Sequence, residues 1–93
     1  MPYDLYDYLL ANGKNDLRSW AEGLQKEQRA KLNEKLDKLR LCGEELYPRM
    51  LTDTDERGIL KLRVRGRVQL RPLLCRGPVN SKTEYTLLMG AQE

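Results

Sequence analysis

The strongest constraint on this sequence is an alternation of apolar and basic residues that begins after Ile59. Leucine or valine occupies positions 60, 62 and 64, and lysine or arginine occupies positions 61, 63 and 65. Because successive side chains of a strand point to opposite faces, such a segment has one apolar face and one basic face. A second alternating run follows Gly66 and spans positions 68–75. The two runs predict a β-hairpin whose apolar face packs on a core.

Matching the apolar faces of the two runs predicts their register. The expected cross-strand pairs are Val64–Val68, Leu62–Leu70, Arg63–Gln69 and Lys61–Arg71, with residues 65–67 as a three-residue loop. Like charges that face each other across two strands destabilise a sheet. The pair Lys61–Arg71 therefore suggests that an anion completes the basic face. The alternative is a solvated sheet face that is simply rich in arginine.

The hairpin also concentrates the positive charge of the chain. The stretch 57–82 holds no acid and eight basic residues, namely Arg57, Lys61, Arg63, Arg65, Arg67, Arg71, Arg76 and Lys82. The whole chain has 17 basic and 14 acidic residues, so the remainder has 9 against 14 and a net charge of −5. A one-sided positive surface attracts phosphate polyanions or an acidic protein partner.

The remaining patterns predict the elements around the hairpin. The expected order is a strand at 3–10, a short helix from Asn15 or Asp16, a helix at 25–42, a connector at 44–55, the hairpin, and a strand at 84–89. Leu32, Leu36 and Leu39 form the apolar stripe of the long helix, and Gly43 is suited to end it. Pro72 cannot donate to a ladder, so it predicts an edge or a bulge. These elements predict one α+β domain over residues 1–93, with two helices packed on a small, mostly antiparallel sheet.

The outer face of the 25–42 helix mixes both signs of charge. Glu27–Lys31 and Glu34–Lys38 are spaced i, i+4 with the acid first, which supports a helix. Lys35 lies among the same acids. We therefore expect a solvated helix surface here and not a nucleic-acid face.

Composition also disfavours several classes of protein. No apolar run approaches the ~20 residues that cross a bilayer, and the first residues carry acids where a secretory signal carries basic residues. We therefore expect a cytoplasmic protein without membrane contact. The sequence has no His and two cysteines, Cys42 and Cys75. A disulfide framework and a zinc site are therefore not expected, and no cofactor is expected either.

Four motifs follow one another along the chain. They are a Tyr-rich strand followed by NGKNDLRSWAEGL, the helix QRAKLNEKLDKLRLCG, the strand GILKLRVRG, and QLRPLL followed by YTLLMG. In this order they resemble the RelE/HigB-like toxin family, in particular its phage-derived branch. The resemblance implies a β-α-α-β-β-β fold and the toxin half of a toxin–antitoxin pair. It also implies a ribosome-dependent mRNA endonuclease, or mRNA interferase, with the ribosome, mRNA and an acidic antitoxin as partners.

The residues of the hairpin suggest how such a cleavage works without a metal. Arg63 and Arg71 match the family's strand arginines, and both suit the stabilisation of a charged phosphorane. Lys61 is the candidate base, because neighbouring arginines should lower its pKa. Tyr85 is a candidate acid or stacking group, although a role in the core is preferred. The residues expected to bind RNA are Arg57, Arg65, Arg67, Arg76 and Lys82.

Two departures from the family pattern leave other functions open. Met89 stands where the family commonly has His, and the family's Lys-rich tail after the following glycine is not in this sequence. These departures favour a catalytically silent, phage-encoded binding module on the same fold. A third possibility is a relative that inhibits DNA gyrase by protein contact, which the acid-free basic face disfavours.

Overall fold

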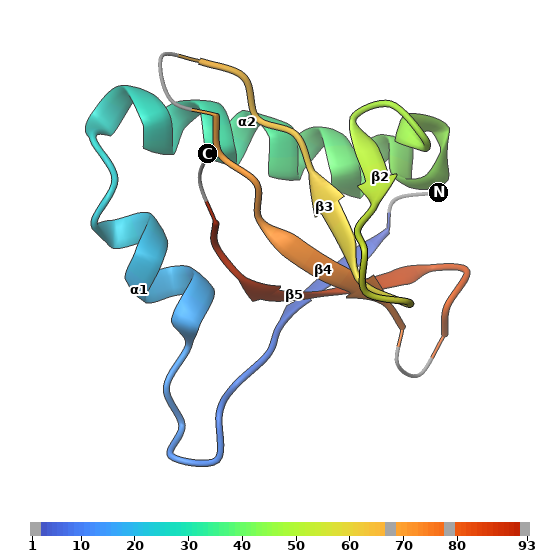
Figure 1. The fold of residues 1–93 in the computed structure, drawn as a ribbon, viewed down its shortest axis with the longest axis horizontal. Helices are drawn as coiled ribbons and strands as arrows, with labels where there is room; N and C mark the ends of the chain where they lie inside the picture. Colours follow the sequence, from blue (N-terminus) through green and yellow to red (C-terminus); the bar gives the residue numbers. More distant parts are fainter. Residues whose placement is uncertain (1–2, 67–68, 78–79, 92–93) are drawn as a thin grey trace.

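The computed structural model describes residues 3–66, 69–77 and 80–91, and within them the chain forms a five-stranded sheet in the order β1-β5-β4-β3-β2 (Figure 1). The strands are β1 (Asp4–Asp7), β2 (Leu51–Asp53), β3 (Leu60–Leu62), β4 (Leu73–Arg76) and β5 (Glu84–Met89). β1 pairs with β5 in parallel, and the other three pairs are antiparallel. The α+β class and the mostly antiparallel sheet are confirmed.

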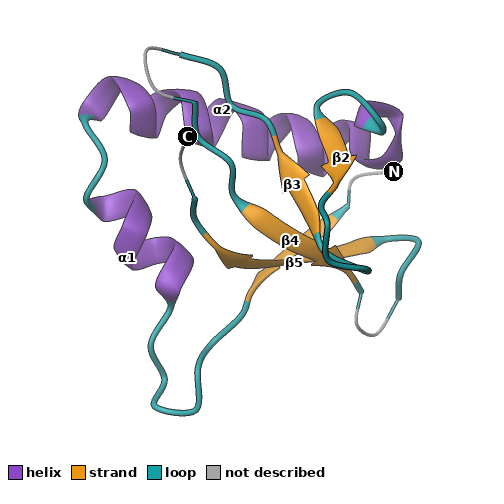
Figure 2. Cartoon of the chain, in the orientation of Figure 1, coloured by secondary structure: helices purple, strands orange, loops and turns teal. Residues whose placement is uncertain are grey.

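Two helices, α1 (Asp16–Glu22) and α2 (Lys26–Cys42), cover one face of the sheet (Figure 2). Asn15 begins α1, because its Oδ1 accepts from the Arg18 N–H at 2.9 Å. Gly43 ends α2 with a φ of 54°, and a Cβ there would overlap the Tyr3 ring. These ends agree with the sequence prediction. Within the described part of the chain, neither helix is long and apolar enough to span a membrane.

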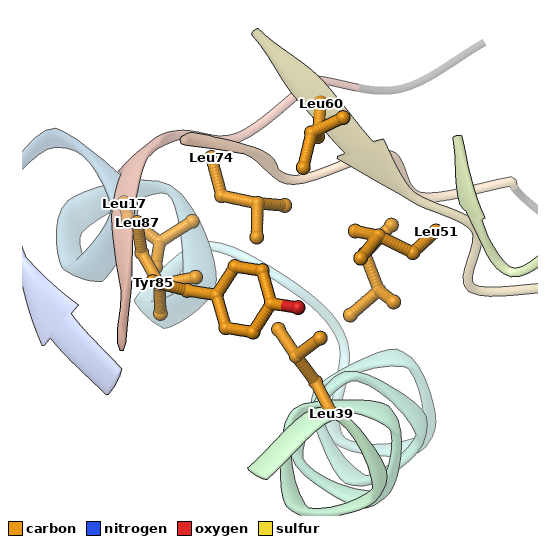
Figure 3. Packing of buried hydrophobic residues seen from close by; sticks show 8 residues of the cluster. Leu17, Leu39, Leu51, Leu60, Leu74, Tyr85 and Leu87 are labelled. Carbon is orange, nitrogen blue, oxygen red and sulfur yellow. The ribbon is translucent and has the colours of Figure 1, made fainter. Parts of the chain in front are cut away.

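The core consists of two groups of buried side chains between the helices and the sheet. The main cluster contains Leu17, Leu39, Leu51, Leu60, Leu62, Leu74, Tyr85 and Leu87 (Figure 3). The second cluster contains Leu24, Leu32, Val64 and Leu70. Leu36 is only partly buried, but it contacts both clusters. Leu60, Leu62 and Val64 are all buried, which confirms the apolar face predicted from the alternation.

Two predicted element bounds are wrong. β1 ends at Asp7, well before Leu10, and the chain turns at 11–13 with Gly13 at a φ of 83°. The expected connector at 44–55 holds a 3₁₀ turn, η1 (Gly43–Leu46), and the short edge strand β2. A strand of three residues in a polar segment has too few apolar positions to produce a readable alternation.

The predicted hairpin register is wrong by two residues. In the structure Leu60 pairs with Leu74 and Lys61 pairs with Leu73, and an isolated bridge joins Val64 to Leu70. The connection after Val64 is therefore longer than the three residues expected. A shift of two residues leaves every side chain on its predicted face, because the side-chain period of a strand is two.

Pro72 lies immediately before β4, next to an irregularity in the sheet. Its carbonyl accepts from the Leu62 N–H at 3.0 Å, and it has no N–H of its own to pair on the other side. Leu73 pairs with Met89 whereas Leu74 pairs with Leu87, so Leu88 is an extra residue in β5. This bulge beside Pro72 confirms the prediction made from the proline.

Candidate functional site

The end of the sheet where β3 leads into β4 carries three arginines around one hollow. The hollow has a volume of about 360 Å³ and is lined by Arg63, Val64, Arg65, Gly66, Gln69, Leu70 and Arg71. We call it the outer hollow. Its arginines alternate along the chain with buried residues that face the helices, so the arginines lie on the opposite face of the sheet. None of these described lining residues is acidic.

Hydrogen bonding places Arg63 and Arg71 directly opposite each other. Val64 and Leu70 exchange both backbone hydrogen bonds at 3.0 Å, and the Leu62 N–H donates to the Pro72 carbonyl. The positions between these two pairs form a non-hydrogen-bonded pair, in which Cα atoms approach to about 4.5 Å and side chains leave the same face. The two arginines therefore extend from one face of the sheet as neighbours.

The three arginines of the outer hollow differ in their surroundings. The Arg71 Nη2 donates to the Gln69 Oε1 at 3.3 Å, and this contact helps to orient the guanidinium. Arg63 and Arg65 are exposed, and no described carboxylate lies within ion-pair distance of either. Arginines that face each other in this way can both bind one phosphate group through charged hydrogen bonds.

Lys61 does not occupy the position predicted for it. It lies opposite Leu73 in β4 and Thr52 in β2, so Arg63 and not Lys61 faces Arg71. The correction follows from the two-residue shift in register. Lys61 remains on the same face of β3 as Arg63, but it is not among the described residues that line the outer hollow.

The other predicted RNA-binding residues do not gather at this end of the sheet. Arg57 is exposed in the turn before β3, and Lys82 is exposed in the turn before β5. Both turns lie at the opposite end of the β3–β4 pair from the outer hollow. Arg67 is outside the described residues. Of the residues predicted to bind RNA, Arg65 therefore lines the outer hollow, whereas Arg57 and Lys82 lie away from it.

Arg76 does not line the outer hollow and pairs instead with an acid on the helix-covered side. Its Nε and Nη2 donate to the Glu44 Oε1 at 3.1 and 2.7 Å. Its guanidinium also lies 5.4 Å from the centre of the Tyr47 ring. The hydrogen bond to Glu44 raises the pKa of Arg76 further. We call this arrangement of Glu44, Arg76 and Tyr85 the paired end of the sheet.

Tyr85 belongs to the paired end and not to the outer hollow. Tyr85 is 1% exposed and its ring packs in the main cluster (Figure 3). Its hydroxyl donates to the Glu44 carboxylate. Burial and this hydrogen bond raise the pKa of Tyr85. For Glu44, burial acts to raise the pKa, but the hydrogen bonds from Arg76 and Tyr85 outweigh it and lower the pKa below its ordinary value. The preferred core role of Tyr85 is therefore confirmed.

A second hollow contains basic residues that the sequence patterns did not single out. This α2 cleft has a volume of about 700 Å³ and is lined by Lys31, Glu34, Lys35, Pro48, Arg49, Met50, Arg63 and Arg65. In Figure 1 the chain that follows β3 runs beside α2, which forms one wall of the cleft. The available signal for the cleft was the spacing of Lys31 and Lys35 by one helical turn. The sequence predicts a solvated surface for these lysines, because each has an acid nearby in the sequence.

The α2 cleft begins where the pairing of β2 with β3 stops. The Arg63 N–H donates to the Met50 carbonyl at 2.8 Å, and beyond this bond the chain that follows β3 is bridged to Leu70 only, through Val64. Arg63 and Arg65 therefore line both the outer hollow and the α2 cleft. The two hollows share these residues and differ in the rest.

Other common kinds of site receive no support from the described residues. Among them, no three His, Cys, Asp or Glu side chains lie close enough together to hold a metal ion. Cys42 and Cys75 are free thiols, and burial raises the pKa of Cys75. A thiol with a raised pKa is a poor nucleophile, because the thiolate is the reactive form.

Comparisons with known proteins do not assign the chain to a group. No family model matches it, no curated protein matches its sequence, and no solved structure matches its fold. The toxin-family resemblance therefore rests on the four sequence motifs alone.

Proposed function

We propose that this protein is a RelE/HigB-like toxin that cleaves mRNA on the ribosome, with the outer hollow as its phosphate-binding site. The observation that supports the proposal is the cross-strand pair of Arg63 and Arg71, with Arg65 beside it and no described acid in the lining. An ordinary solvated surface mixes both signs of charge. The exposed arginines Arg63 and Arg65 attract an anion such as the RNA backbone.

In the proposed reaction the ribose 2′-oxygen attacks the adjacent phosphorus and the bond from phosphorus to the 5′-oxygen breaks. Arg63 and Arg71 hold the phosphate and stabilise the charge that develops on its oxygens. Lys61, on the same face of β3, is the candidate acceptor for the proton of the 2′-hydroxyl. Water supplies the proton to the leaving 5′-oxygen. The products are a 2′,3′-cyclic phosphate and a 5′-hydroxyl.

The test compares cleavage of ribosome-bound mRNA by the parent and by Arg71→Ala. We expect the parent to cut and the variant to cut ~10²-fold or more slowly, by analogy with removal of one oxyanion donor. Arg29→Ala on the exposed face of α2 is the matched control, because Arg29 lines neither hollow. Primer extension on the mRNA measures the rate, and thermal melting checks that each variant is folded.

The outcome that removes the proposal is clear-cut. A folded parent that leaves ribosome-bound mRNA intact is not a ribonuclease of this kind. Equal cleavage by the parent and Arg71→Ala would retain the activity but place it elsewhere. Expression in bacteria adds a further check, since DNA damage without mRNA cleavage would favour gyrase inhibition.

A second candidate function is a non-cleaving binding module on the same fold. The observation that favours it is the composition of the outer hollow, whose described polar side chains are arginines and one glutamine. These groups bind phosphate well, but none of them exchanges a proton readily near neutral pH. Binding of RNA by the parent without any cleavage would support this candidate.

A further inference from the structure

The face of the sheet that points away from the two helices, which we call the outer face, begins with an acidic row. β1 and β5 pair in parallel, and their register places Asp4 beside Glu84. The charge of Asp4, and then that of Glu84, raises the pKa of Tyr6 above its ordinary value, so the three side chains lie close together. The second row, two residues further along the strands, consists of Tyr6, Thr86 and Cys75. These three side chains are uncharged at neutral pH.

The charge of the outer face changes sign further along the same strands. The third row contains Thr52, Lys61 and Leu73, and the fourth row contains the opposed pair of Arg63 and Arg71. Rows on one face of a strand lie two residues apart, which is about 6.7 Å. The acidic row is therefore about 20 Å from the fourth row. The outer face is negative at one end and positive at the other.

The middle of the outer face is uncovered and mainly apolar. Both helices pack on the other face of the sheet (Figure 2), and Tyr6 remains 49% exposed. Leu73 and Cys75 are partly exposed in the same two middle rows. The Thr86 hydroxyl donates to the Gly77 carbonyl at 2.6 Å. A partner that covers this row therefore leaves the Thr86 hydroxyl hydrogen-bonded.

The order of the charges argues against RNA as the occupant of the whole outer face. A polyanion that binds Arg63 is repelled by Asp4 and Glu84 if it continues along the strands. A complementary partner is positive opposite the acidic row, apolar opposite Tyr6 and Leu73, and negative opposite Arg63. The outer face of a second copy, turned end for end, meets all three conditions.

We infer that the outer face is the interface of a homodimer, in which two copies pack face to face about a two-fold axis. The axis lies in the interface and reverses the direction of the strands. The acidic row of each copy therefore meets Lys61 and Arg63 of the other copy. Such an interface is isologous, so each charged contact occurs twice. The inference goes beyond the proposed function and does not depend on catalysis.

The dimensions of the outer face predict a weak, reversible dimer. Five strands at about 4.8 Å spacing and four rows at about 6.7 Å spacing cover roughly 600 Å². Each partner in a standard interface contributes about 800 Å². We therefore expect monomer and dimer to exchange in the micromolar range of protein concentration.

Sedimentation velocity over a range of protein concentrations tests the inference. The protein is first treated with nuclease and repurified, so that RNA does not bridge two copies. The acidic-row variant is Asp4→Lys/Glu84→Lys, and the basic-end variant is Lys61→Glu/Arg63→Glu. We expect the parent to dimerise and each variant to dimerise at least about tenfold more weakly, because like charges then face each other. Asp4→Lys alone is a milder variant, since the Glu84 carboxylate also accepts from the Asn80 N–H at 2.6 Å.

An equimolar mixture of the two double variants is the decisive sample. The new lysines of one variant face the new glutamates of the other, and the unchanged charges face each other at the second contact. We expect the mixture to form a heterodimer with an affinity within about threefold of that of the parent. A general loss of folding does not give this result, because restored association requires two folded partners.

Controls on α2 separate the outer face from net charge. Glu27→Lys/Glu34→Lys and Arg29→Glu/Lys38→Glu make the same changes in charge at exposed positions of the helix. We expect both controls to dimerise within about twofold of the parent. Circular dichroism melts compare the stability of all variants.

A single substitution tests the apolar middle of the outer face. Tyr6→Ala removes a half-exposed ring, and we expect it to weaken the dimer at least about tenfold because the ring is buried on association. Leu41→Ala is the matched control, since Leu41 is 70% exposed on α2. We expect the Leu41→Ala variant to dimerise as the parent does.

Three results would overturn the inference. One is a nuclease-treated parent that stays monomeric up to millimolar concentration. Another is an equal loss of association in the outer-face variants and in the α2 controls. The third is a mixture of the two double variants that does not associate although each variant is folded and the parent dimerises. Cleavage of ribosome-bound mRNA is measured separately, so these results do not decide the proposed function.

Discussion

Arg76 ends β4 and Arg63 follows β3, its neighbour in the sheet, but their surroundings are opposite in charge. Arg76 donates two hydrogen bonds to Glu44 and lies over the Tyr47 ring. Arg63 faces Arg71 and has no described carboxylate partner. The comparison shows that an arginine in this hairpin stabilises the fold where the chain supplies an acid. It is available to an external anion where the chain supplies another arginine.

The paired end and the outer hollow also differ in the buried apolar cluster against which each one packs. Tyr85 connects the paired end to the main cluster, which contains Leu39 and six further leucines. The outer hollow lies over the smaller second cluster, to which Val64 and Leu70 contribute from its own lining. We therefore expect the stability of the fold to depend most on the paired end, and binding to depend on the end that carries the outer hollow.

The largest expected effect comes from the core beneath the paired end. Leu39 is 0% exposed in the main cluster, so Leu39→Ala should lower the free energy of unfolding by about 2–5 kcal/mol. Urea denaturation measures the change. Leu41→Ala on the same helix is the control. Leu41 is 70% exposed, so its substitution should change the free energy of unfolding by no more than about 0.5 kcal/mol. Similar effects from the two substitutions would contradict the observed orientation of α2.

Glu44→Ala is expected to have the next largest effect. It leaves the buried Tyr85 hydroxyl and the Arg76 guanidinium without their acceptor. We expect a loss of about 1–2 kcal/mol, limited by the partial exposure of the Glu44 side chain. Glu45→Ala is an adjacent control, since Glu45 is exposed in the same 3₁₀ turn. If both substitutions are neutral, the paired end does not stabilise the fold as we describe.

The same carboxylate predicts a dependence of stability on pH. Hydrogen bonds from Arg76 and Tyr85 lower the pKa of Glu44 in the folded state from the ordinary value of 4.5. The folded state then binds fewer protons at Glu44 than the unfolded state, so this stabilisation is present above pH 4.5 and is lost as the pH falls through the lower folded pKa. Urea denaturation at a series of acidic pH values should show a steeper loss for the parent than for Glu44→Gln. Parallel curves would mean that Glu44 has the same pKa in both states.

Much of the fold could be predicted from the sequence because the patterns are local. The caps at Asn15 and Gly43 and the alternation from Leu60 to Val64 each depend on neighbouring residues. The register of the hairpin could not be predicted in the same way. Alternation repeats every two residues, so it determines the face of a strand but not which pair of positions meets across it.

The candidate site could be predicted only in part for a similar reason. Arg63 and Arg71 come together under either register as members of one face, although the predicted partner of Arg71 was Lys61. The separation of Arg76 from this group depends on Glu44, which is 32 residues away in the sequence. The α2 cleft likewise combines Lys31 with Arg49 and Arg65, a tertiary arrangement without a local signature.

The smallest expected effects come from one arginine substitution at each end of the sheet, and they should change the free energy of unfolding in opposite directions. Arg63→Gln removes one of the like charges that face each other across β3 and β4, so it should raise the free energy of unfolding by about 0.2–1 kcal/mol at low salt. Added salt screens exposed charges and should remove this gain. Arg76→Gln should instead lower stability, because it takes the charged guanidinium away from the Glu44 carboxylate. Urea denaturation at two salt concentrations measures both variants. Two changes of the same sign would mean that the described contrast between the two ends does not control the stability of the sheet.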